Sequence, residues 1–141
     1  NIQGDAFIFD LFYDRLSKVE PVSERTPIFR NIHLSNVTGN DIKRIGYIKG
    51  IEEMPISELS FSNMNIVAGK GFQAETATDI RFNNVSFTVE EGPSLNIRQC
   101  KDIFLNDVRT KQPIAGQPVV DLEAIENLSI IHCDSTQIVR K

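Results

Sequence analysis

The sequence lacks several features that mark common functional classes. Its 141 residues include only two cysteines and two histidines, which excludes a disulfide framework and gives no cluster with metal-ligand spacing. No apolar run approaches the length of a membrane span. The formal net charge is −4 and no basic stripe exists, which argues against nucleic acid as a partner. There is also no glycine-rich phosphate loop. We therefore expect no membrane, no nucleic acid, no metal and no cofactor.

Helical periodicity is almost absent as well. Apolar and polar residues alternate instead, in short segments at 6–9, 32–34, 59–61, 80–82, 95–97 and 120–122. Glycine, asparagine, aspartate and proline fall between these segments, as turns require. The sequence therefore predicts an all-β protein.

One apolar–x–apolar pattern, followed by polar residues and a further apolar one, recurs along the chain. Its copies begin at Ile32, Leu59, Ile80, Ile103 and Leu128, in steps of 27, 21, 23 and 25 residues. Repeats of this length made of β-type segments indicate a solenoid, in which each repeat stacks on its neighbours. We predict a right-handed, single-stranded parallel β-helix of about five coils over residues 1–141, with a loop inserted at about 14–27.

Aligning the repeats predicts a second set of strands. Its central residues, expected to point inward, are Ile8, Ile48, Ala74, Ile97 and Leu122. The residues on either side of them are expected to point outward. One outward column is Phe7, Tyr47, Gln73, Asn96 and Asp121, and the other is Phe9, Lys49, Glu75, Arg98 and Glu123. The second column alternates in charge beyond Phe9, which favours register-fixing surface pairs.

The first rungs of these outward columns form the candidate binding site. Phe7, Phe9, Tyr47 and Lys49 would make an exposed aromatic patch with a cation beside it, suited to a sugar face and a carboxylate. Alternatively, further coils or the loop at about 14–27 cover this patch.

A polar column lies four residues after each repeat start. Its members are Asn36, Asn63, Asn84, Asp107 and His132. Asparagine tolerates left-handed turns and forms hydrogen bonds along a stack, so we interpret the column as a structural ladder at a corner. A metal site built from Asp107 and His132 is the alternative, but two ligands without a third make a poor site.

No catalytic residue emerges from the sequence. The two cysteines, Cys100 and Cys133, fall in different inward columns and are expected to be buried free thiols. His33 lies at an outward position with no obvious nucleophile beside it, so no Ser–His–Asp arrangement is expected. The adjacent pairs Glu52–Glu53 and Glu90–Glu91 would diverge in a strand, unlike the paired carboxylates of glycosidases.

Several segments resemble a known family. The runs at 4–13, 21–38, 50–56 and 59–66 are similar to the C-terminal part of bacterial polygalacturonase-like enzymes, glycoside hydrolase family 28. The resemblance implies a parallel β-helix within a periplasmic or secreted enzyme that hydrolyses galacturonosyl or related pectin bonds by inversion. It also implies pectic oligosaccharide or polysaccharide as the ligand.

The family's Asn-x-Asp, Asp-Asp and Gly-His-Gly motifs are absent from this chain. Arg109-Thr110-Lys111 has the letters of the fourth motif, Arg-x-Lys, but falls at a turn. We therefore expect the C-terminal portion of such a hydrolase, inactive alone, whose open N-terminal end contacts further coils of its own or self-associates. The alternative is a non-catalytic carbohydrate-binding or structural β-helix module.

Overall fold

The protein is described from a computed structural model, which covers residues 2–11 and 28–141. The loop expected at about 14–27 lies outside the described residues. The strands are β1 (Ile2–Asp10), β2 (Arg30–Lys49), β3 (Ile56–Glu75), β4 (Ala77–Arg98), β5 (Lys101–Arg109), β6 (Val120–Glu123), β7 (Glu126–Ile131) and β8 (Ile138–Arg140). A 3-10 turn, Ser135–Gln137, precedes β8. Among the described residues, no helix is long and apolar enough to cross a membrane.

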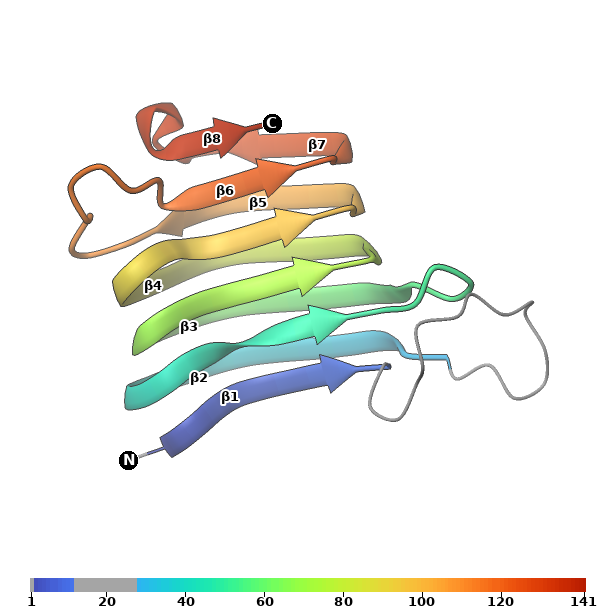
Figure 1. Ribbon diagram of the computed structural model, residues 1–141, viewed down its shortest axis with the longest axis horizontal. Helices are drawn as coiled ribbons and strands as arrows, with labels where there is room; N and C mark the ends of the chain where they lie inside the picture. Colours follow the sequence, from blue (N-terminus) through green and yellow to red (C-terminus); the bar gives the residue numbers. More distant parts are fainter. Residues whose placement is uncertain (1, 12–27) are drawn as a thin grey trace.

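The strands wind into a right-handed parallel β-helix, which confirms the predicted fold (Figure 1). The long strands β2, β3 and β4 each run along one side, turn a corner and return along the other. Their first halves stack with β5 and β7 into what we call the first sheet. Their second halves stack with β1, β6 and β8 into the second sheet. All of these pairings are parallel, and the chain makes about four turns.

The register of the first sheet follows the sequence repeat. Ile32 pairs with Leu59, Leu59 with Ile80, Ile80 with Ile103, and Ile103 with Leu128. The repeat therefore specifies the pairing of every rung of this sheet. The reason is that a slip of one residue would move each apolar side chain to the solvent face.

Left-handed residues make the corners. The predicted ladder residues Asn36, Asn63, Asn84, Asp107 and His132 all have φ between 52° and 58°. A second left-handed column, directly before each repeat start, comprises Asn31, Glu58, Asp79, Asp102 and Asn127. Asparagine and aspartate are the non-glycine residues that adopt this conformation most readily, which explains their recurrence at these two positions.

The interior is mainly apolar, and the buried polar residues among those described are Ser86, Thr88 and Ser94. Inward positions such as Ile48, Ile97 and Leu122 are at most 1% exposed, as the repeat alignment predicts. Phe61 and Phe82 stack on successive rungs with ring centroids 4.9 Å apart, and Phe72 meets Phe61 edge-on at 5.1 Å. These aromatic contacts fill the space between the two sheets and add to the stability from burial.

The first rung corrects the sequence interpretation. Phe7 pairs with Gly46, Ile8 with Tyr47, and Phe9 with Ile48, one residue out of the predicted register. Phe7 and Phe9 therefore pack against the core, whereas Ile8, predicted to be inward, is 55% exposed. The physical reason is that two aromatic rings bury more apolar area than Ala6 and Ile8 would in the same positions.

Burial falls off toward the N-terminal end of the β-helix. Phe7, Phe9, Ile32 and Leu34 are only partly buried, although their counterparts in the next rungs are fully enclosed. Among the described residues, the N-terminal edge of the core is therefore accessible.

Candidate functional site

The predicted aromatic patch does not form as a unit. Phe7 and Phe9 face the core, as described above, so only Tyr47 and Lys49 remain on the outer face of the second sheet. Asp10 takes the place predicted for Phe9, because it pairs with Lys49. The alternating charges of that column thus begin one rung earlier, with Asp10 opposite Lys49.

A polar cluster surrounds Tyr47 instead. Arg44 donates from Nε to Asp5 Oδ1 at 2.8 Å and from Nη2 to Asp5 Oδ2 at 2.5 Å. The Arg44 guanidinium also lies over the Tyr47 ring, 4.7 Å from its centroid. The hydrogen bond to Asp5 is the main reason that the pKa of Arg44 is raised. This cluster joins β1 to β2.

The Tyr47 hydroxyl completes the cluster by donating to Asp10 Oδ2 at 3.1 Å. Burial, followed by this hydrogen bond and the negative charge of Asp10, raises the pKa of Tyr47 above its ordinary value. Both carboxylates on this end of the sheet therefore have partners within the protein. They hold the first rung in place.

A polar track continues from Tyr47 along the outer face. Gln73 and Asn96 follow Tyr47 on the next two rungs. Both also line a shallow hollow of about 200 Å³, whose rim includes Lys70 and Glu91. Lys70 and Glu91 pair at 3.4 Å and are more than half exposed. The track thus presents amides and both signs of charge along the helix axis, at a spacing of about 4.8 Å per rung.

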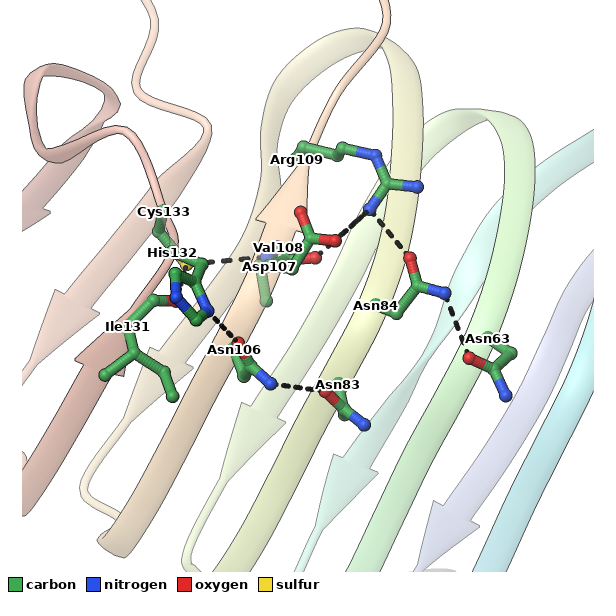
Figure 2. A network of polar contacts seen from close by, with 10 residues as sticks. All are labelled: Asn63, Asn83, Asn84, Asn106, Asp107, Val108, Arg109, Ile131, His132 and Cys133. Carbon is green, nitrogen blue, oxygen red and sulfur yellow. Dashed lines mark hydrogen bonds and ion pairs between the residues drawn. The ribbon is translucent and has the colours of Figure 1, made fainter.

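The predicted ladder is a real hydrogen-bonded column at the corner of the first sheet (Figure 2). Asn63 donates to Asn36 at 3.4 Å, and Asn84 donates to Asn63 at 2.9 Å. Arg109 continues the column on the next rung. It donates to Asn84 at 3.0 Å and pairs with Asp107 at 3.0 Å. Arg109, which the sequence placed at a turn, is the last residue of β5 and serves this ladder.

His132 joins a different column. Its Nδ1 lies 3.0 Å from Asn106 Oδ1, and Asn106 in turn donates to Asn83 at 2.6 Å (Figure 2). Asp107 is engaged by Arg109, so the alternative of a metal site from Asp107 and His132 has no geometric support. Among the described residues, no three histidine, cysteine or carboxylate side chains gather as a metal would need.

Both cysteines are free thiols, as expected, but the expectation that Cys133 is buried is wrong. Cys100 is buried, and burial raises its pKa to about 11. Cys133 is only partly buried, and its sulfur accepts a hydrogen bond from the Val108 backbone at 3.4 Å (Figure 2). A thiol that stays protonated at neutral pH is a poor nucleophile, so Cys100 serves the core.

The expectation that His33 has no nucleophile beside it is wrong. Ser60 Oγ lies 2.6 Å from His33 Nδ1, and Asn31 Oδ1 lies 2.8 Å from His33 Nε2. The three side chains are on the outer face of the first sheet, on its first two rungs, and His33 is exposed. The signal was present in the sequence, because His33 and Ser60 are the second residues of consecutive repeats and therefore face each other across the rung.

Comparison of the chain with protein-family models, with curated proteins and with solved structures finds no match in any of the three. The fold is therefore established by its own strand pairing. The resemblance to polygalacturonase-like enzymes stays a prediction.

Proposed function

We propose that this β-helix is the C-terminal portion of a periplasmic or secreted, pectin-degrading glycoside hydrolase of the polygalacturonase type. Its role is to extend the outer face on which a pectic chain lies. The observation that carries the proposal is the track of Tyr47, Gln73 and Asn96 on consecutive rungs of the second sheet. A track parallel to the helix axis suits an extended polymer with repeated hydroxyl groups.

Lys70, the cation at the rim of the hollow, is the group that would bind an acidic sugar. Lys70 lines the hollow next to Gln73 and Asn96 and is 59% exposed, so its ammonium group can turn toward a ligand carboxylate. The pair with Glu91 that it would give up is a surface pair, worth no more than about 1 kcal/mol. In this proposal, the inverting hydrolysis takes place in further coils that stack on the N-terminal side of β1.

A non-catalytic carbohydrate-binding module is the second candidate. It is favoured because neither carboxylate at the first rung is poised as a general acid or base. Asp5 is bound by Arg44, and Asp10 accepts a hydrogen bond from Tyr47. A purely structural β-helix is the remaining alternative.

The experiment titrates the 141-residue chain with trigalacturonate and with a neutral galactose trimer, following backbone amide shifts by NMR. We expect trigalacturonate to shift Tyr47, Gln73 and Asn96 and the neutral trimer to bind more weakly. Lys70→Gln should remove this difference, whereas Lys101→Gln, a cation paired elsewhere with Glu126, should not.

A reducing-sugar assay with polygalacturonate completes the test, and we expect no turnover above the blank. Clear turnover would contradict a portion that lacks the catalytic residues. Equal binding of both trimers, without turnover, would favour the general carbohydrate-binding module. Absence of binding would favour a structural β-helix.

A further inference from the structure

The Ser60–His33–Asn31 cluster is independent of the polar track, because it lies on the other sheet. We propose that it is a nucleophile–base–orienting triad for acyl transfer, acting on an accessible carboxylic ester. The geometry is that expected of an activated serine: nucleophile and base within hydrogen-bond reach, with the base oriented by a third group. The two distances are 2.6 Å and 2.8 Å.

Asn31 determines the tautomer of His33. A carbonyl oxygen only accepts hydrogen bonds, so with Asn31 Oδ1 opposite Nε2 the hydrogen of the neutral imidazole lies on Nε2. Nδ1 is then unprotonated and accepts the Ser60 hydroxyl hydrogen. This is the protonation state that a general base needs.

The backbone holds Asn31 in position. Its φ of 58° belongs to the left-handed corner column, and Arg30, next to it, pairs with Ser57 of the following rung. His33 and Ser60 are themselves paired in register. Both the base and its orienting group are thus carried on paired strands.

Arg81 supplies a cation on the next rung. It pairs with Ser60 in register, so base, nucleophile and cation follow one another along a single outward column. Arg81 Nε donates to Asp79 Oδ1 at 3.2 Å. This hydrogen bond uses one of the five N–H donors that a guanidinium carries. A guanidinium beside the nucleophile can stabilise the negative charge that develops on an ester carbonyl oxygen.

The reaction follows from these positions. Ser60 Oγ bonds to the ester carbonyl carbon as its proton passes to His33 Nδ1. The bond from that carbon to the alcohol oxygen then breaks, and Nδ1 returns the proton to the leaving alcohol. Water attacks the acyl-serine with His33 again as base, which releases the carboxylic acid and restores the Ser60 hydroxyl. An open sheet face sets no size limit on the acyl group, so the substrate class is an accessible carboxylic ester.

The test labels the 141-residue chain with a fluorophosphonate probe and maps the adduct by peptide mass spectrometry. Ser62 provides the matched control, since it lies two residues further along β3 on the same face. We expect the adduct on Ser60, its loss in Ser60→Ala, and its retention in Ser62→Ala. His33→Gln should slow labelling about 100-fold or more.

Asn31 is a positioning residue and is tested by paired variants. Asn31→Gly keeps the left-handed backbone accessible but removes the acceptor, so labelling should slow. Asn31→Asp restores an acceptor and should restore labelling. Circular dichroism of each variant checks that the β-helix is intact.

Two results would overturn the proposal. One is an adduct spread evenly over surface serines or found on Ser62. The other is unchanged labelling in His33→Gln with the fold preserved. Hydrolysis of p-nitrophenyl acetate is a supporting readout only in comparison with Ser60→Ala, because an imidazole alone also cleaves activated esters.

Discussion

Arg44 of β2 binds Asp5 of β1 through two parallel hydrogen bonds, at 2.8 and 2.5 Å, and so ties the first rung to the second. The Asp5 side chain is 11% exposed and that of Arg44 31%. A bidentate pair this sheltered contributes more than a surface pair, although partial exposure of the guanidinium weakens it.

The first prediction concerns this pair. Arg44→Ala should lower the free energy of unfolding by about 1–2 kcal/mol, because it leaves a sheltered carboxylate without its partner. Urea denaturation measures the loss. Lys70→Ala is the control, since the Lys70–Glu91 pair is exposed and its removal should cost less than about 0.5 kcal/mol. Equal losses in the two variants would contradict the structural role of Arg44.

The second prediction follows from the raised pKa of Tyr47. A group whose pKa is higher in the folded state contributes stability that is complete below its unfolded pKa of about 10. That contribution is lost as the pH rises through the folded pKa. Wild-type protein should therefore lose more stability above pH ~10 than Tyr47→Phe, measured by urea midpoints across the alkaline range. Parallel curves for the two proteins would show that Tyr47 titrates normally.

The third prediction separates backbone strain from hydrogen bonding in the ladder. Asn84 has φ 55°, donates to Asn63 and accepts from Arg109. Asn84→Gly removes the hydrogen bonds but suits the left-handed backbone, whereas Asn84→Ala also adds strain. We expect Asn84→Ala to be the less stable variant, by about 1 kcal/mol. If the two unfold at the same denaturant concentration, conformation does not explain the asparagine at this corner.

The fourth prediction concerns thiol reactivity. Cys100 is buried with a pKa of about 11, so it should react with a thiol reagent only when the protein unfolds. Cys133 is partly exposed and should react in the native protein. Alkylation with and without urea, followed by peptide mass spectrometry, gives the two rates. Native labelling of Cys100 at the rate of Cys133 would contradict its burial.

Much of this architecture could be predicted from the repeat. A parallel solenoid stacks equivalent residues, so one alignment predicts both the inward columns and the Asn36-to-Asn84 ladder. Prediction failed at β1, where Phe-Ile-Phe can be aligned with the next rung in two ways. Burial of the aromatic rings, which no local pattern encodes, decides between them.

The side-chain clusters were harder to foresee. Arg44 and Asp5 are stacked in one column with Lys70 and Glu91, but the repeat alignment did not include that column. Their pairing also depends on the register of β1, which the alignment missed. His33 and Ser60 were correctly aligned, yet whether neighbouring polar groups bond depends on rotamers and on a third residue, Asn31. Aligning the repeats predicts which residues lie close together, and the structure shows how their side chains are oriented.

The last prediction is that the 141-residue chain self-associates through its N-terminal end. Phe7, Phe9, Ile32 and Leu34 leave the core partly exposed there, and the outer edge of β1 has no strand partner among the described residues. The opposite end differs on the second sheet, because Arg140 of β8 occupies the register position of the buried Leu122. A charge at such a position discourages further stacking.

Sedimentation at increasing protein concentration tests this asymmetry. Phe7→Lys, which puts a charge into the exposed core edge, should shift the chain toward monomer. Ile130→Lys, a matched change on the terminal rung of the first sheet, where Ile130 is 36% exposed, should leave association unchanged. A wild-type chain that stays monomeric at high concentration would contradict the prediction. Loss of association only in Ile130→Lys would move the contact to the other end of the β-helix.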